Sequence, residues 1–338
     1  MKAIKIESPG NILLLEIEKP VPAENEALIK INFAGICGSD IGAFRGTNGL
    51  VSYPRVIGHE LVGEVITIPE NNKRNIKTGD KIIVEPYLSC GTCYPCSIGR
   101  TNCCTDLNVL GVHVDGGIAE YITHSADMLI KLPLNMDLSV APIVEPLSIA
   151  LHGIHRLALS PGEHIAVFGA GAIGLLAAMT AIQYGAIPIV IDMIDKRLEL
   201  AKTLGVQHTI NIKNEDLLEK INLFTNGRGC ECVMEASGSN SAIRSSLDAA
   251  SFAGRIVLTG WPKKETQLPT DMITKKELDV CGARNSAGEF EEAIELIHTG
   301  KVNAKAILTR LISLDEVPSV LRDIEQNPGN YLKVNTFI

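Results

Sequence analysis

Several features that would assign a sequence to a special class are missing from this chain. No apolar run in its 338 residues reaches the roughly 20 residues that a membrane-spanning helix needs. Basic residues are in deficit, with 31 Lys and Arg against 39 Asp and Glu and a net charge of -8, which argues against a basic face for nucleic acid. The first residues, MKAIKIESPGNILLLEIE, carry no cleavage signature and are typical of strands. We therefore expect a cytosolic protein that binds neither membrane nor nucleic acid.

The composition is that of a folded protein with room for two domains. Hydrophobic residues make up 46% and charged residues 21% of the chain, which excludes a disordered polypeptide. Residues 1–147 hold short strand patterns broken by Gly and Pro, at 27–36, 60–68 and 81–85. These residues predict an irregular β-rich domain whose loops carry polar side chains.

The pattern changes in residues 148–281, where short apolar runs alternate with helical segments. The predicted strands are HIAVFGA, IPIVIDM, HTINI, ECVMEASG, RIVLTG and LDVCGA, and the predicted helices between them include AIGLLAAMTAIQYG, IDKRLELAKTLG, NEDLLEKINLFT and SAIRSSLDAA. Repeated strand–helix–strand units predict a parallel, doubly wound sheet of the Rossmann type. Residues 282–338 contain an amphipathic helix, EFEEAIELIHTG, and a final strand, YLKVNTFI, and we expect them to rejoin the first domain.

A glycine motif marks a dinucleotide site in the second domain. Gly169, Gly171 and Gly174 form GAGAIG, with Ile173 between the last two, after an apolar strand and at the start of a helix. The first glycine allows a tight turn, the second lets the backbone approach a pyrophosphate, and the third lets helix and strand pack closely. The helix N-terminus then offers free N–H groups to the phosphates.

An acid closes the next strand, as the dinucleotide reading requires. Asp192 should accept hydrogen bonds from the adenosine ribose, and its charge would oppose a 2′-phosphate, which favours NAD(H) over NADP(H). Lys196 and Arg197 follow closely and weaken that preference. We count Arg197 among the cofactor-binding residues.

Five of the nine cysteines crowd into one loop, which favours metal binding over disulfides in a cytosolic enzyme. Cys90, Cys93, Cys96 and Cys104 supply four closely spaced thiolates, the donor set of a closed structural zinc site. The lobe that they define spans about residues 86–106. Cys103 is either free or takes the place of Cys104.

A second constellation is sparser and predicts a catalytic metal. Cys37 begins the run CGSD, and His59 and Glu60 stand in GHE. A thiolate, an imidazole and a carboxylate are sufficient for a zinc ion with one open position. Singly, a histidine or cysteine of this kind is more often a buried core residue, and the spacing alone does not show that the three meet.

The motifs taken together resemble the zinc-containing medium-chain dehydrogenase/reductase family of alcohol and sorbitol dehydrogenases. They are CGSD, GHE, the four-cysteine lobe, DGGIAEY, VEPL and GAGAIG, in order along the whole chain. The resemblance implies a GroES-like catalytic domain and a Rossmann domain, with the active site in the cleft between them. Within the family, SYPRVIGHE, GRTNCC, LGVHVDGG and GARNSAGEFEEAIELI are most similar to the bacterial L-galactonate and L-gulonate 5-dehydrogenases and the starvation-sensing protein B group.

The resemblance also implies a ligand set for the catalytic zinc. Cys37 and His59 match ligands, Glu145 matches the third ligand, and Glu60 matches a carboxylate that ligates or approaches the metal. Asp40 matches an acid that orients the ligand histidine.

Proton handling follows from the same resemblance, with one departure. Ser39 matches the hydroxyl that takes the substrate's proton while hydride passes to the nicotinamide. Zinc would act as a Lewis acid that lowers the pKa of the alcohol. Gly42 stands where many relatives have the histidine that completes the proton relay, so water, Glu60 or Glu145 must replace it, and we favour the carboxylates.

The implied substrate is a sugar acid, oxidised at a secondary hydroxyl to a keto-acid with NAD as acceptor. Its carboxylate needs a cation, for which Arg is well suited. The candidates are Arg45, Arg55, Arg100 and Arg284, although the family position of Arg284 places it at the cofactor pyrophosphate. Alternatives are a sorbitol-, inositol- or threonine-type dehydrogenase, or an NAD-binding protein without turnover. Relatives imply a homodimer or homotetramer that pairs near residues 255–283.

Overall fold

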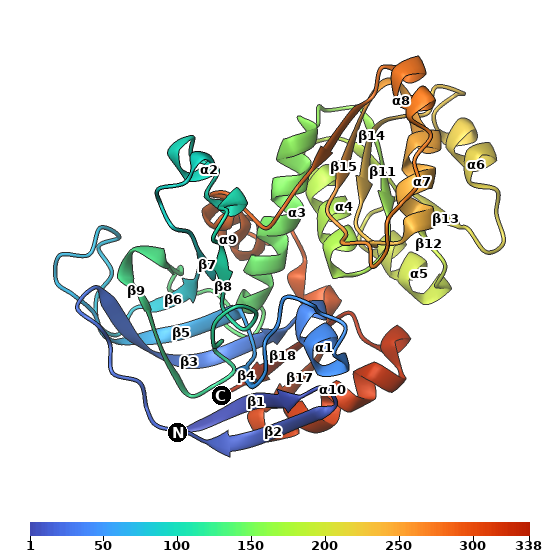
Figure 1. Ribbon diagram of the computed structural model, residues 1–338. Helices are drawn as coiled ribbons and strands as arrows, with labels where there is room; N and C mark the ends of the chain where they lie inside the picture. Colours follow the sequence, from blue (N-terminus) through green and yellow to red (C-terminus); the bar gives the residue numbers. More distant parts are fainter. The chain divides into compact units, whose positions relative to one another are not determined.

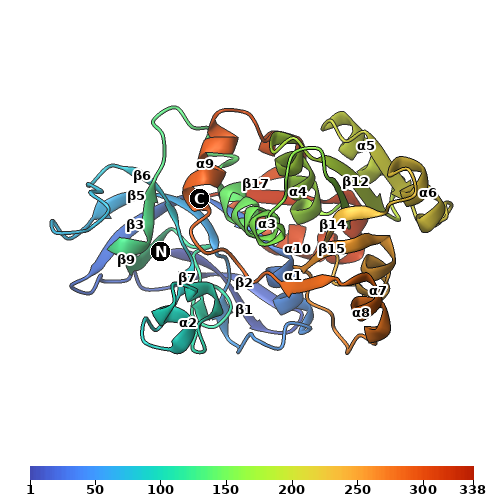
Figure 2. The ribbon, with the colours of Figure 1, turned by 90° about the horizontal axis from the view of Figure 1, so that it is seen from above.

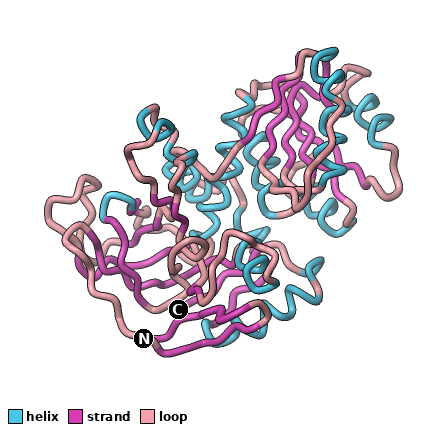
Figure 3. Tube along the Cα trace, in the orientation of Figure 1, coloured by secondary structure: helices cyan, strands magenta, loops and turns pink.

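The computed structural model describes all residues, 1–338, and the chain divides into two compact units. The first comprises Met1–Glu145, Phe290–His298 and Ile307–Ile338, and the second comprises Pro146–Glu289 and Thr299–Ala306. Strands dominate the first unit, whereas strands and helices alternate in the second (Figure 3). None of the helices combines the length and the apolar character that crossing a membrane would require.

The first unit is built on a seven-stranded sheet in which residues distant in sequence become neighbours. The order is β10-β6-β5-β3-β18-β17, with β9 also paired to β3, and smaller sheets have the orders β2-β1-β4 and β7-β8. The strands are β1 (Lys2–Ser8), β2 (Asn11–Glu16), β3 (Glu26–Ile36), β4 (Arg55–Val56), β5 (Glu60–Thr67), β6 (Lys81–Val84), β7 (Tyr87–Leu88), β8 (Asn108–Val109), β9 (Tyr121–Ser125), β10 (Leu129–Lys131), β17 (Leu308–Ser313) and β18 (Lys333–Phe337).

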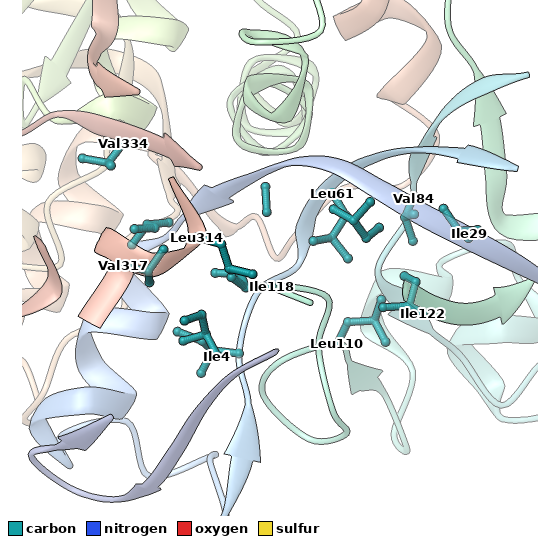
Figure 4. Packing of buried hydrophobic residues seen from close by; sticks show 14 of the residues in the cluster. Ile4, Ile29, Leu61, Val84, Leu110, Ile118, Ile122, Leu314, Val317 and Val334 are labelled. Carbon is teal, nitrogen blue, oxygen red and sulfur yellow. The ribbon is translucent and has the colours of Figure 1, made fainter. Parts of the chain in front are cut away.

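Helices in this unit are few and short. They are α1 (Gly38–Arg45), α2 (Tyr94–Ser97), α9 (Phe290–His298) and α10 (Val317–Gln326), with 3₁₀ turns at η1 (Thr101–Cys103), η2 (Ala126–Met128), η3 (Ala141–Ile143), η5 (Leu314–Glu316) and η6 (Pro328–Asn330). Residues Val317, Val320, Leu321 and Ile324 of α10 are buried, at the spacing of one helix face. They join a core that includes Ile4, Ile29, Leu61 and Ile118 (Figure 4).

The second unit is a six-stranded sheet in which every pairing is parallel. Its order is β13-β12-β11-β14-β15-β16, with strands β11 (His164–Phe168), β12 (Ile187–Asp192), β13 (His208–Asn211), β14 (Cys230–Glu235), β15 (Ala250–Leu258) and β16 (Asp279–Gly282). The helices are α3 (Val144–Leu157), which starts at the boundary, α4 (Ala172–Gln183), α5 (Asp195–Thr203), α6 (Leu217–Phe224), α7 (Asn240–Ala249) and α8 (Thr270–Lys276), with η4 (Ala304–Ile307).

Helices cover both faces of this sheet, so its central strands are largely buried. Helices α4 and α5 lie on one side and α7 and α8 on the other (Figures 1 and 2). All five residues of β11 are buried, as expected for a central parallel strand. The chain order reverses between β11 and β14, and ligands of doubly wound sheets bind at the carboxyl ends of the strands at such a point. The expected combination of a β-rich domain and a parallel, doubly wound sheet is confirmed.

Candidate metal centre and dinucleotide site

Neighbouring strands of the first unit bring three of the predicted metal ligands together. β3 ends immediately before Cys37, and β5 begins immediately after His59. In the antiparallel pairing of these strands Gly35 lies opposite Glu60. The Cys37 sulfur, a His59 ring nitrogen and a Glu60 carboxylate oxygen all lie within 4.8 Å of one another. The antiparallel register of β3 and β5 therefore brings the three side chains together, which their spacing in the sequence did not show.

A glycine makes room for the carboxylate in this cluster. A Cβ atom on residue 35 would lie 1.8 Å from Glu60 Oε2. Any larger residue would displace the Glu60 side chain, which is fully buried. Gly35 therefore contributes to the site by its lack of a side chain.

Lys333 is a component of the site that the sequence analysis did not identify. It opens β18, its Nζ donates to Ile36 O at 3.1 Å, and it forms a buried ion pair with Glu60. Burial by itself lowers the pKa of the Lys333 ammonium, but the charges of Glu60, Cys37 and Glu145, together with the hydrogen bond to Glu60, outweigh it and leave the pKa raised. The site thus contains one fixed positive charge.

Glu145 lies outside the mutually close group and contacts a second residue that the sequence analysis missed. It stands in the first turn of α3, and the Tyr87 hydroxyl donates a hydrogen bond to its Oε1. Burial is the main cause that raises the pKa of Glu145 to about 7, while the positive charge of His59 opposes the rise and Glu60 adds to it. Burial, and then Glu145 itself, raise the pKa of Tyr87 well above its ordinary value.

The other two predicted catalytic residues lie in the first turn of α1. Asp40 is buried, and its Oδ2 accepts a hydrogen bond from the Cys37 backbone N–H at 2.8 Å. Its relation to His59 is electrostatic, because neither Asp40 Oδ1 nor His59 Nδ1 has a hydrogen-bond partner. The Ser39 hydroxyl oxygen is also buried without a partner, and such a group is costly unless a ligand satisfies it.

The charge balance of the cluster fits a bound dication. Asp40, Glu60 and Glu145 are all at most 2% exposed, and Lys333 forms an ion pair with Glu60. Burial of uncompensated carboxylates is strongly unfavourable. Burial alone would lower the pKa of His59, but the surrounding Cys37, Asp40 and Glu145 raise it well above 6.5, so the site favours positive charge. A thiolate, an imidazole and a carboxylate are also the donors that zinc prefers.

The four-cysteine lobe forms a second candidate metal site. The sulfurs of Cys90, Cys93, Cys96 and Cys104 all lie within 4.8 Å of one another, and no disulfide joins them. The Cys104 sulfur accepts backbone N–H groups from Cys90 at 3.2 Å and Asp106 at 3.3 Å. Backbone N–H groups that donate to sulfur stabilise the thiolate form. The backbone N–H groups of Thr105 and Cys96 in this way lower the pKa of Cys93 to about 6. Cys103 lies outside the group.

Loss of one thiolate from this lobe should remove one zinc ion. We expect Cys90→Ser to lower the zinc content from two ions to one per chain, because a closed tetrahedral site needs all four ligands. The measurement is metal analysis of purified protein, with Cys103→Ser as the matched control that keeps two. Two zinc ions retained in Cys90→Ser would contradict the assignment.

The glycine loop has the geometry that a dinucleotide requires. It joins β11 to α4 beside β14, and Gly169 has φ +101°, a conformation that favours glycine. A Cβ atom on Gly174 would lie 1.8 Å from Gly169 O, so this glycine allows helix and strand to pack closely. A Cβ on Gly171 would meet nothing within 4 Å, which leaves the N-terminus of α4 open to a ligand. Ile173 lies in the first turn of the same helix.

Asp192 ends β12 and also holds the glycine loop in place. Its Oδ2 accepts from Ala170 N at 2.7 Å, and its Oδ1 accepts from Met193 N and Ile194 N. Arg197 Nη1 lies 4.0 Å from Asp192 Oδ2. The carboxylate is therefore held rigidly at the end of the strand, beside a cation.

The cofactor preference should depend on the charge of Asp192. We expect Asp192→Ala to shift the ratio of kcat/KM for NAD over NADP by at least about tenfold towards NADP, since removal of one repulsive charge is worth about 1.4 kcal/mol or more. Steady-state kinetics with both cofactors measures this ratio. Asp195→Ala removes a nearby charge on α5 and should leave the ratio unchanged; an unaltered ratio in Asp192→Ala would refute its role.

Two of the four candidate arginines already have ion-pair partners. Arg45 pairs with Glu325 at 3.6 Å, and Arg55 pairs with Asp115 at 3.4 Å. These contacts favour a structural role for both. Arg100, at the start of η1, and Arg284, two residues after β16, stay candidates for ligand contacts.

Comparisons with known proteins agree with this arrangement. Residues 23–134 match the alcohol dehydrogenase GroES-like domain, and residues 172–299 match the zinc-binding dehydrogenase family. A zinc-type alcohol dehydrogenase-like protein of Haemophilus influenzae is 53% identical over 99% of this chain and 98% of its own. The L-galactonate-5-dehydrogenase of Escherichia coli is 36% identical over 91% of each chain.

A solved structure supports the same relationship. The crystal structure of the alcohol dehydrogenase RspB from Escherichia coli CFT073, complexed with NADH, superposes with a TM-score of 0.94 at 34% identity, covering 100% of this chain and 99% of that one. The expected family and cofactors are thereby confirmed. The chain belongs to the zinc-containing medium-chain alcohol dehydrogenase family and is a zinc-dependent, NAD-linked alcohol or polyol dehydrogenase.

Proposed function

We propose that this enzyme oxidises a secondary hydroxyl of a hexonate, such as L-galactonate or L-gulonate, to the keto-acid with NAD as acceptor. The observation that carries the proposal is the carboxylate-rich centre, in which Glu60 and Glu145 are both buried near Cys37 and His59. Such a centre suits a polyhydroxylated substrate better than a simple alcohol. The relative named L-galactonate-5-dehydrogenase supports the choice of a sugar acid.

The residues of the centre divide the chemistry between them. Cys37, His59 and either Glu60 or Glu145 would hold zinc, which when bound supplies Lewis-acid activation of the alcohol. Ser39 relays the hydroxyl proton: its Oγ, which is buried without a partner, would accept that proton while its own hydroxyl proton passes on towards Glu145. Asp40 holds the Cys37 backbone and adds negative charge beside His59.

We assign the later proton transfer to Glu145 in place of the histidine that Gly42 replaces. Glu60 is committed to its ion pair with Lys333. Glu145 instead accepts from a neutral hydroxyl, Tyr87, which keeps it able to exchange a proton. The distinct partners of the two carboxylates therefore favour Glu145.

A substrate panel tests the proposed specificity. We expect kcat/KM for L-galactonate or L-gulonate to exceed that for sorbitol, inositol and L-threonine by about 10- to 100-fold, because a charge-assisted hydrogen bond to the carboxylate is worth roughly 1.5–3 kcal/mol. The rate of NADH formation measures this at equal substrate concentrations.

The same panel separates the alternatives. Fastest oxidation of a neutral polyol or of L-threonine would contradict the hexonate proposal and favour the second candidate, which the match to a relative named sorbitol dehydrogenase supports. No turnover of any alcohol by the zinc-loaded protein would favour an NAD-binding protein without catalysis.

We further propose a cytoplasmic homodimer or homotetramer. Strand β16 lies at the edge of the parallel sheet, where its free side is able to pair with a second copy. Sedimentation analysis of the full chain tests the assembly, and a monomer at micromolar concentration would contradict it.

A further inference from the structure

Tyr87 is a buried polar residue that contacts the proposed proton-transfer group, Glu145, but neither holds the metal nor takes the proton itself. Tyr87 is only 5% exposed, and its hydroxyl donates a hydrogen bond to Glu145 Oε1. A tyrosine hydroxyl in a buried site is stabilised by such a partner. The bond therefore restrains the positions of both the Tyr87 hydroxyl and the Glu145 carboxylate.

The position of Tyr87 is set independently of Glu145. Its backbone pairs with Val109 in the β7–β8 sheet, and its ring packs edge-on against Phe290, with the centroids 6.3 Å apart at 68°. Cys90 follows three residues later and belongs to the four-cysteine lobe. The hydroxyl is thus held by a strand, a ring contact and the root of that lobe.

Glu145 lies near the metal-binding cluster but is not one of its mutually close donors. Its carboxylate is absent from the set of donor atoms within 4.8 Å of one another, which consists of Cys37, His59 and Glu60. Yet the charges of His59 and Glu60 are near enough to influence its ionisation. A carboxylate so close to a metal-binding cluster would ligate the ion unless another donor held it.

We propose that Tyr87 is a positioning residue that holds Glu145 outside the Cys37–His59–Glu60 group. The inference rests on the proposed metal centre. The hydroxyl bonds one carboxylate oxygen, Oε1, and so fixes where the rest of the Glu145 carboxylate lies. The Tyr87–Glu145 bond therefore decides how readily Glu145 becomes a ligand. While the bond persists, Glu145 serves proton transfer; without the bond, Glu145 would become available as a further ligand of a bound metal.

Tyr87→Phe is the direct test, because it removes the hydroxyl and keeps the ring that packs on Phe290. The probe is Co²⁺ loaded in place of zinc, whose visible absorption reports the number and geometry of its ligands. We expect an altered spectrum and about tenfold tighter Co²⁺ binding in competition with a chelator, at the lower end of changes that groups around the ligands cause. kcat should fall more than KM changes, because Glu145 is then withdrawn from proton transfer.

Two further variants make the outcome specific. Tyr121→Phe alters a tyrosine that packs against Lys19 away from the cluster, and it should leave the spectrum and affinity unchanged. In a Glu145→Gln background, Tyr87→Phe should produce no further spectral change, because the ligand that it releases is no longer a carboxylate.

The Co²⁺ spectra separate the positioning role of Tyr87 from the existence of the metal centre. A normal Co²⁺ spectrum in the unaltered protein that stays identical in folded Tyr87→Phe, with equal affinity, would overturn the positioning role alone. A spectral change that persists in the Glu145→Gln background would also overturn it. A protein that binds Co²⁺ only at the four-cysteine lobe would contradict the metal centre, and the inference with it.

Discussion

Replacement of His59 with alanine is expected to lower kcat/KM for alcohol oxidation by about a thousandfold. The reason is that a Lewis acid supplies several kcal/mol of stabilisation to the developing charge, and about 4 kcal/mol corresponds to a factor of ~10³. His59 is 5% exposed, and its ring nitrogen lies within 4.8 Å of the other two donor atoms of the cluster. The measurements are steady-state kinetics and zinc content on the same preparation.

A second buried histidine of the same unit provides the control. His124 is 3% exposed, and its Nε2 lies 2.9 Å from Glu85 O, away from the cluster. We expect His124→Gln to change stability but to retain kcat and both zinc ions. Activity within about threefold of the unaltered protein in His59→Ala would show that the catalytic metal does not depend on this residue.

The second large effect concerns folding. Lys333→Met is expected to lower the free energy of unfolding of the metal-free protein by about 3–5 kcal/mol, because it leaves the Glu60 carboxylate buried without a countercharge. Glu60 is fully buried and Lys333 is 4% exposed, so water cannot compensate. The loss should shrink when zinc is bound, since the metal then neutralises Glu60. Urea unfolding followed by circular dichroism measures both values.

An exposed ion pair in the same sheet is the matched control. Lys81 and Glu64 approach to 2.6 Å, but both side chains are 38% exposed. Lys81→Met should therefore cost no more than about 1 kcal/mol, as exposed pairs do. Equal losses for Lys81→Met and Lys333→Met would show that the buried pair has no special role.

Much of the fold was predictable because its local patterns are strong. The predicted strand at 27–36 corresponds to β3, and the predicted helix at 172–185 corresponds to α4. Both combine the hydrophobic period of their element with clear boundaries. The strand predicted at 255–260 starts earlier in the structure, where β15 begins at Ala250. The residues before 255 were not predicted as strand because the backbone is irregular there: Ala253 has a positive φ, which breaks the alternation of a regular strand.

Helix α10 was not predicted, although its signals are in the sequence. Ser313 and Glu316 form a capping box just before it, and apolar residues recur at 317, 320, 321 and 324. Short helices such as α1, which buries only three side chains, carry weaker signals.

The site was predictable only where the motif lies in one stretch of chain. Cys37 and His59 stand in recognisable runs, whereas Lys333 meets Glu60 across 273 residues and Tyr87 meets Glu145 across 58. A lysine in a strand normally faces solvent, so the sequence of the last strand gave no sign that Lys333 is buried at the metal site. Only the pairing of β18 beside β3 places its ammonium next to the carboxylate.

The central claim, that a zinc ion in the Cys37–His59 cluster carries an NAD-linked oxidation, is tested most directly by metal titration. Protein stripped to the zinc of the four-cysteine lobe is titrated with Zn²⁺ while NADH formation is followed with the best substrate of the panel. We predict negligible turnover at one zinc per chain and full activity at two. Full turnover at one zinc per chain, with the cluster empty, would contradict the claim.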